Sequence, residues 1–200
     1  MAKLPLDNGR VLQKLKTREA LVGKANELLK KGGLNSIEQA AKDAGISKAT
    51  AYRYFTSLES LKREASLQLK AENPADLFSD IASDNLSGRL NRLIDYHYHL
   101  FIENEDEFRL FLGSVITESV TNREVNQRGG RRVAMIREAL QPLTGIVSKS
   151  EFDHMVNSLS LVFGIESITI LKDLCELSDE AILENWRWTV DRIVGKAGHL

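Results

Sequence analysis

The chain has 200 residues, of which 42% are hydrophobic and 28% are charged, an ordinary composition for a globular protein. Its three prolines and thirteen glycines exclude a collagen-like or low-complexity chain. The formal net charge of -1 is unevenly distributed. Residues 1–70 carry fourteen Lys and Arg against seven Asp and Glu, whereas residues 71–200 carry thirteen against twenty-one. This asymmetry predicts a basic first part that meets a polyanion and an acidic remainder that does not.

Cysteine content and hydropathy indicate a cellular compartment. Cys175 is the single cysteine of the sequence, so a disulfide within one chain is excluded and a reducing environment is expected. The first residues lack the apolar run of a signal peptide. The longest uncharged apolar-rich stretch, 154–165, is much shorter than the roughly 20 residues that span a bilayer. We therefore expect a cytoplasmic protein.

Hydrophobic periodicity predicts an all-α fold, because apolar residues recur at spacings of three and four and sustained alternation is missing. Residues 1–15 are expected to form a weakly structured basic arm. The helices predicted after it cover 17–31, 37–44, 48–55 and 58–71. Gly32 and Gly33 end the first of these helices, and Ser36, Ser47 and Ser57 precede the next three at the N-cap position.

A domain boundary is expected at Asn73-Pro74, because the residue before a proline disfavours helix and the charge changes sign there. The predicted domains are therefore 1–72 and 73–200. Helices of the second domain are predicted over 75–83, 86–104, 107–121, 122–141, 150–176 and 178–197. Ser150 and Ser178 are expected to begin the last two, since acidic residues follow each of them.

The most informative segment is SIEQAAKDAGISKATAYRYF, residues 36–55. Two short helices flank a tight turn over 44–47, in which Gly45 can adopt a positive φ and Ile46 can fill the angle between the helices. This arrangement predicts a helix-turn-helix, whose second helix enters the major groove of DNA. Tertiary packing must hold that helix, because isolated helices of fewer than about 12 residues are marginal.

The second short helix is predicted to have an inward and an outward face. Ile46, Ala51 and Phe55 are expected to point inward. The outward face carries a set of side chains suited to DNA: Lys48, Ala49, Tyr52 and Arg53. Lysine and tyrosine commonly bind phosphates, arginine can recognise guanine, and an alanine methyl group can contact thymine. The alternatives are that Tyr52 belongs to the core and that Lys48 and Arg53 are merely solvated charges.

This segment resembles the DNA-binding domain of the tetracycline-repressor (TetR) family of bacterial transcription regulators. The matching residues are Ala44, Gly45, Ile46, Ser47, Thr50, Tyr52, Tyr54 and Phe55, followed by Ser57, Glu59 and Leu61. The resemblance covers about residues 17–65, and the chain departs from it at Leu58, where the family usually has a lysine. It implies a three-helix helix-turn-helix domain followed by a larger helical domain for ligand binding and dimerisation.

The resemblance also implies a function, that of a homodimeric regulator, most simply a repressor that a small-molecule effector releases from a pseudo-palindromic operator. The residues expected to contact double-stranded DNA are Ser36, Ser47, Lys48, Ala49, Thr50, Tyr52, Arg53 and Tyr54. No cofactor is expected, and the sequence lacks the common enzyme motifs. The alternative is a helical ligand-binding or scaffolding protein whose basic part contacts another protein.

The resemblance places dimerisation on the last two long helices, and the sequence there is apolar on more than one face, as in central or interface helices. The candidate interface residues are Val156, Leu159, Phe163, Leu171, Trp186 and Val190. The aromatic group of this domain is expected to be mostly core, and it is also the candidate lining of the effector pocket: Tyr96, His97, Phe101, Phe108 and Phe111. His97 and His99 are two residues apart and so do not share a helix face, and no metal site is expected.

Overall fold

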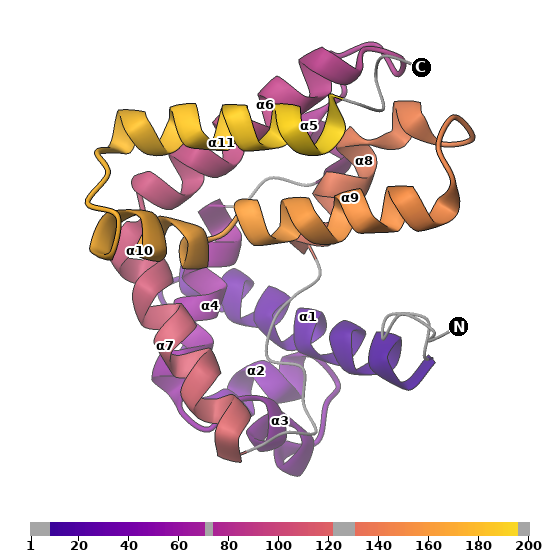
Figure 1. Ribbon diagram of the computed structural model, residues 1–200. Coiled ribbons are helices and arrows are strands. Elements are labelled where there is room, and N and C mark those ends of the chain that lie inside the picture. The colour runs from indigo at the N-terminus through magenta and orange to yellow at the C-terminus, as the bar shows by residue number, and fades with distance from the viewer. Residues whose placement is uncertain (1–8, 71–73, 122–130, 196–200) are drawn as a thin grey trace. The chain divides into compact units, whose positions relative to one another are not determined.

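A computed structural model describes residues 9–70, 74–121 and 131–195 of the chain, and all structural statements concern these residues (Figure 1). They form helices joined by turns and contain no strand, apart from one isolated bridge between Thr144 and Val147. The predicted all-α class is therefore confirmed. The residues group into two compact units, Met1–Ala71 with Leu110–Gly129, and Glu72–Arg109 with Gly130–Leu200.

The first unit begins with α1 (Gly9–Lys30), α2 (Ile37–Asp43), α3 (Lys48–Tyr54) and α4 (Leu58–Lys70). The helix starts predicted at residues 37, 48 and 58 are confirmed. The predicted arm over 1–15 is corrected, because α1 already begins at Gly9, and only 1–8 of it lie outside the described residues. Neither glycine nor proline interrupts residues 10–22, and Val11 and Leu15 continue the helical apolar spacing.

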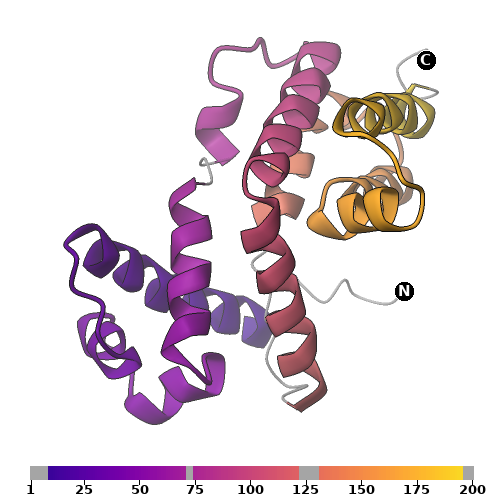
Figure 2. The same ribbon diagram turned by 90° about the vertical axis from the view of Figure 1, so that its left-hand side faces the viewer.

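The core of the first unit gathers small and large apolar side chains from all four helices. α1 crosses α4 (Figure 2), while α2 packs against both α1 and α3. The buried residues are Leu21, Val22, Ala25, Leu34, Ile37, Ala40, Ala41, Ala51, Tyr54, Phe55, Leu61 and Ala65. The short α2 and α3 are therefore held by tertiary packing, as their length requires.

The second unit contains α5 (Pro74–Leu77), α6 (Leu86–Ile102), α8 (Arg131–Ala139), the 3₁₀ turn η2 (Gln141–Leu143), α9 (Lys149–Val162), α10 (Ile165–Asp173) and α11 (Asp179–Val194). α9 and α11 lie side by side in both views (Figures 1 and 2). Their inner faces meet α6 and α8 around a core whose largest side chains are Trp186, Phe163, Leu93, Met135 and Leu159.

Three predicted helices of this unit are corrected. The helix predicted over 150–176 is two helices, because the chain is extended at Gly164, which is the N-cap of α10. α9 starts at Lys149 with Ser148 as its cap rather than at Ser150, since the Ser148 hydroxyl accepts from the Glu151 amide in an S-x-x-E arrangement. The helix predicted over 75–83 is only α5. Of the helix predicted over 122–141, residues 122–130 lie outside the described residues, and the remainder is α8, which ends at Ala139.

α7 (Glu105–Thr121) is one continuous helix that contributes to both units. Its first residues, up to Arg109, group with the second unit, and its residues from Leu110 group with the first. The division therefore differs from the single cut at residues 72 and 73 that the sequence suggested, because an unbroken helix carries the chain back to the first unit.

No helix in the described ranges is, by itself, long and apolar enough to cross a bilayer. α9 and α10 reach that length and hydropathy only when taken together, and the chain bends by 52° between them.

Candidate nucleic-acid interface

The turn between α2 and α3 has the geometry that the sequence predicts. Gly45 has a φ of +67°, a left-handed conformation that glycine adopts without a steric penalty. The amide of Ile46 donates to the Ala41 carbonyl at 2.8 Å, which closes the turn. Ile46 is half-buried and packs on the core of the first unit, so it fixes the angle between α2 and α3.

Hydroxyl groups at the helix starts hold the ends of α2 and α3. The Ser36 Oγ accepts from the Gln39 amide at 3.1 Å. The Ser47 Oγ accepts from the Thr50 amide at 3.2 Å and donates to the Thr50 Oγ1 at 2.9 Å. Of the predicted DNA-contacting residues, Ser36 and Ser47 are thus the N-caps that position the two helices, and Thr50 is the partner of the Ser47 cap.

α3 separates an inward from an outward face. Ala51, Tyr54 and Phe55 are buried, which confirms Phe55 as a core residue. The structure also places Tyr54 in the core, at 2% exposure, although the sequence analysis counted it among the DNA contacts. Its position, three residues after Ala51, gives both side chains the same helix face. The outward face carries the exposed residues Lys48, Ala49, Tyr52 and Arg53.

An acidic residue of α2 organises two of these outward side chains. The Glu38 Oε1 accepts from the Lys48 Nζ at 2.7 Å and from the Tyr52 hydroxyl at 2.9 Å. The Lys48 ammonium also lies 5.7 Å from the centre of the Tyr52 ring. We call Glu38, Lys48 and Tyr52 the Glu38 cluster.

The charges in the Glu38 cluster reinforce one another. The hydrogen bond from Lys48 is the largest influence that lowers the pKa of Glu38, to about 2, and the bond from Tyr52 adds to it. The same contacts with Glu38 raise the pKa of Lys48 and of Tyr52. The carboxylate and the ammonium are therefore both ionised at neutral pH, and the phenol keeps its proton.

A buried arginine of α1 anchors the end of α3. The Arg18 guanidinium forms a two-pronged ion pair with Glu64 of α4. It donates to the Tyr54 carbonyl at 3.3 Å and lies 4.5 Å from the centre of the Phe55 ring. Arg18 thus ties α1, α3 and α4 together and fixes the outward face of α3 relative to the core.

Sequence reasoning missed both Glu38 and Arg18. Glu38 looks like any acidic residue in a first helical turn, where it suits the helix dipole. Arg18 lies in a row of apolar residues, three after Leu15 and three before Leu21, which was an available signal of a buried, paired cation. The partners of these two residues lie from 10 positions away, as Lys48 does from Glu38, to 46 positions away, as Glu64 does from Arg18, and only the fold identifies them.

Most of the aromatic group proposed as an effector pocket forms a continuous row inside the second unit. The His97 ring lies 5.2 Å from Tyr96, 5.9 Å from Phe101 and 5.1 Å from Phe163, measured between ring centres. Phe101 continues the row to Phe108 at 4.7 Å. The fifth predicted residue, Phe111, belongs to the first unit and is half-buried.

Two polar groups are enclosed by this row. His97 is buried, and burial lowers its pKa to about 4, against the opposing effect of the bond between its Nδ1 and the Leu93 carbonyl at 2.9 Å. Trp186 packs edge-on to Phe163, with 5.5 Å between ring centres, and its buried Nε1 has no hydrogen-bond partner among the described residues. Across the described ranges, no group of three or more His, Cys, Asp or Glu could hold a metal ion.

The candidate dimer residues lie mainly inside the second unit. Val156, Leu159, Phe163, Trp186 and Val190 are buried in its own core, and Leu171 is half-buried. Inward-facing positions of α9, α10 and α11 therefore account for the apolar pattern seen in the sequence. The large apolar side chains that these helices expose are Leu161 at 79%, Leu174 at 78%, Trp188 at 60% and Ile170 at 53%.

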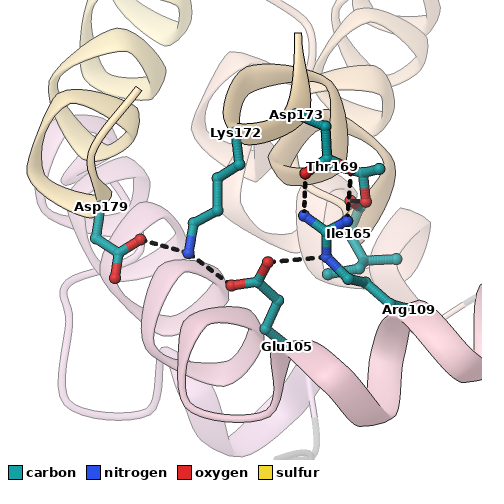
Figure 3. A network of polar contacts seen from close by, with 7 residues as sticks. All are labelled: Glu105, Arg109, Ile165, Thr169, Lys172, Asp173 and Asp179. Atoms are coloured by element: carbon teal, nitrogen blue, oxygen red, sulfur yellow. Dashed lines mark hydrogen bonds and ion pairs between the residues drawn. The ribbon is translucent and has the colours of Figure 1, made fainter. Parts of the chain in front are cut away.

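A second polar cluster joins the start of α7 to α10 and α11 (Figure 3). Arg109 donates to both carboxylate oxygens of Asp173 at 2.7 and 2.8 Å, and to Glu105 at 2.8 Å. The Lys172 ammonium bridges Glu105 and Asp179, at 2.6 Å from each. We call these five residues the Glu105 cluster.

The Glu105 cluster is more enclosed than the Glu38 cluster. Burial by itself would lower the pKa of Lys172, but its hydrogen bonds to Asp179 and Glu105 outweigh burial and raise that pKa. The hydrogen bond from Arg109 lowers the pKa of Asp173. Lys172 and Asp173 therefore stay charged at neutral pH, and the cluster braces the first turns of α7 within the second unit.

Comparison with known proteins gives this chain no relative: no protein-family model, no curated protein and no solved structure matches it.

Proposed function

We propose that this protein is a DNA-binding transcription regulator of the tetracycline-repressor type. The observation that carries the proposal is the pair α2 and α3, joined at Gly45, with Lys48, Ala49, Tyr52 and Arg53 exposed on one face of α3. A helix of this kind can enter the major groove while its neighbours contact the backbone. The excess of positive charge in residues 1–70 supports a polyanionic partner.

The experiment that tests the proposal is a selection from random duplex DNA with the purified protein at about physiological salt, followed by affinity measurements on the enriched sequence. Lys48→Ala should weaken binding to the enriched sequence and reduce the salt slope there by about one per subunit, because one phosphate contact is lost. Lys149→Ala is the matched control, since Lys149 also begins a helix directly after a capping serine.

The selection has two informative results. An enriched pseudo-palindrome with half-sites about 34–36 Å apart would support a two-fold regulator. No enrichment, together with equal effects of Lys48→Ala and Lys149→Ala on binding to random duplex DNA, would contradict the proposal. It would instead favour a basic unit that contacts another protein.

We further propose that the protein works as a homodimer, on the outer faces of α9 and α11. These neighbouring helices each expose a large apolar side chain, Leu161 and Trp188, and apolar patches on a surface commonly mark protein interfaces. A stable interface buries about 800 Å² per partner. Leu161→Glu and Trp188→Glu should each convert a dimer into a monomer by sedimentation velocity without unfolding it, whereas Leu110→Glu, in the first unit, should not.

The third part of the proposed function is release of DNA when a small-molecule effector binds. We propose that the protein acts in the cytoplasm. The aromatic row around His97 and the unpaired Trp186 Nε1 support an effector that is mainly apolar and carries a hydrogen-bond acceptor. α7 supports communication between the two units, because it is continuous from one to the other. Shifting the population from 99:1 to 1:99 would need about 5.5 kcal/mol of differential effector affinity.

A further inference from the structure

We propose that Glu38 competes with DNA phosphates for Lys48 and Tyr52 and thereby lowers the affinity of α3 for non-cognate DNA. The inference deepens the proposed function and rests on it, because it assigns a specificity-determining role to a residue of the same surface. It starts from one atom, the Glu38 Oε1, which accepts from the Lys48 ammonium at 2.7 Å and from the Tyr52 hydroxyl at 2.9 Å.

The Tyr52 hydroxyl has one proton and can therefore make one donated hydrogen bond. In the free protein that proton is directed to Glu38. A phosphate oxygen of DNA can only accept, so Tyr52 must leave Glu38 before it can donate to the backbone of a duplex. Any contact between Tyr52 and a phosphate is therefore an exchange of one anionic acceptor for another.

For Lys48, the number of hydrogens does not limit its contacts with phosphates, but its pairing with a negative charge limits what those contacts contribute. An ammonium group has three hydrogens and could bridge Glu38 and a phosphate. Sequence-independent affinity, however, comes from cations that neutralise phosphates and release condensed counterions. The Glu38 carboxylate already neutralises Lys48, and it would also lie close to the negative backbone. The Glu38 cluster therefore presents much less net positive charge than Lys48 alone would present.

At a cognate site the carboxylate needs a donor in place of the two it gives up. In the major groove the cytosine N4 amino group is the base-edge donor that Glu characteristically accepts from. A site that offers such an amino group near the start of α2 lets Glu38 bind the base while Lys48 and Tyr52 turn to the backbone. A site without it leaves the carboxylate facing phosphates. The same residue thus penalises wrong sequences and favours a particular base pair.

The test uses the full chain and a fluorescein-labelled 30-base-pair duplex of random sequence, titrated at several salt concentrations. Glu38→Gln removes the charge that neutralises Lys48, and Glu38→Ala also removes the acceptor for Tyr52. We expect affinity for this duplex to rise about tenfold per subunit in Glu38→Ala, with a smaller rise in Glu38→Gln, because contacts to charged groups become available. The salt slope should steepen by about one per subunit.

Glu27→Gln and Glu27→Ala are the matched controls. Glu27 is an exposed glutamate of the same unit that pairs with a lysine, Lys24, at 2.9 Å. These variants change the net charge equally but leave α3 untouched, so they measure the effect of charge alone. Tyr52→Phe adds a second readout: it should weaken binding in the Glu38→Ala background more than in the wild type.

Each outcome decides the proposal. Equal gains in duplex affinity in the Glu38 and Glu27 variants would overturn it, since the effect would then come from net charge alone. A loss of duplex affinity in Glu38→Ala, with an unchanged thermal unfolding curve, would also overturn it. Both results leave the proposed DNA binding intact. If the wild type and all variants fail to bind the duplex at 50 mM salt, the proposed function and this inference fail together.

Discussion

The two polar clusters of this protein use the same chemistry in different surroundings. In the Glu38 cluster, the side chains of Lys48 and Glu38 are 70% and 36% exposed, whereas those of Lys172 and Glu105 in the Glu105 cluster are 24% and 20% exposed. Exposed ion pairs contribute little to stability, because water replaces either partner. When an enclosed ion pair is broken, water replaces the lost partner poorly, so the remaining charge is left uncompensated.

Ion pairing alone therefore does not indicate the role of a cluster. Because the Glu38 cluster is exposed, little free energy is needed to separate its groups. Lys48 and Tyr52 can therefore change partners, as the side chains of a binding surface must. In the Glu105 cluster, Arg109 and Lys172 each bind two carboxylates. Breaking one of these contacts leaves enclosed charges without one of their partners. This cluster is suited to fixing the first turns of α7. The predictions for Lys172 and Glu38 test this contrast between the exchangeable Glu38 cluster and the bracing Glu105 cluster, and the prediction for His97 concerns the core of the second unit.

The largest expected effect is acid destabilisation of the second unit through His97. Its pKa is about 4 in the folded chain and 6.5 in the unfolded one, so only the unfolded chain takes up the proton between these values. The free energy of unfolding should therefore fall as the pH drops from 6.5 towards 4, by up to about 3 kcal/mol. Urea unfolding followed by tryptophan fluorescence measures it, since Trp186 and Trp188 both belong to this unit.

His99→Gln is the control for this prediction, because His99 lies on the same helix but is exposed. His97→Phe should remove most of the pH dependence, whereas His99→Gln should preserve it. An unchanged pH profile in His97→Phe would show that other groups of the second unit carry its acid sensitivity.

The second expected effect is the loss of the Lys172 bridge. Lys172→Met leaves Glu105 and Asp179 without the cation between them, so the second unit should lose about 1–2 kcal/mol of unfolding free energy, less than for a fully buried pair. Tryptophan fluorescence in urea again provides the measurement. Lys149→Met, at an exposed position of α9, should leave the midpoint unchanged, and equal midpoints for the two variants would remove the distinction between the clusters.

The smallest expected effect is on the stability of the first unit in Glu38→Gln. Because its partners are exposed, the thermal midpoint followed by circular dichroism should stay at the wild-type value at pH 7. The pKa of Glu38 is about 2, so its carboxylate stays ionised and keeps Lys48 and Tyr52 as donors until the pH falls towards 2. The DNA affinity gained by the variant should therefore be independent of pH from 5 to 8; a marked loss of stability would make Glu38 a brace like Glu105.

Local signals in the sequence predicted much of the fold. Ser36 and Ser47 cap their helices, Gly45 has the expected positive φ, and Phe55 is in the core. Such features depend on interactions within about four residues, which the sequence displays directly. The break at Gly164 was missed because the apolar pattern continues through it, and periodicity alone does not separate one long helix from two.

Local sequence patterns were thus enough to predict the helical class, the turn between α2 and α3, and the set of side chains on the outer face of α3. Tertiary structure decided which apolar residues are core: Tyr54 and Trp186 are enclosed, while Leu161 and Trp188 remain exposed. It also decided the partners of each charge, from Arg18 with Glu64 to Glu38 with Lys48. The physical reason is that a helix displays its periodicity in the chain, whereas the neighbour of each face is set by packing between distant segments.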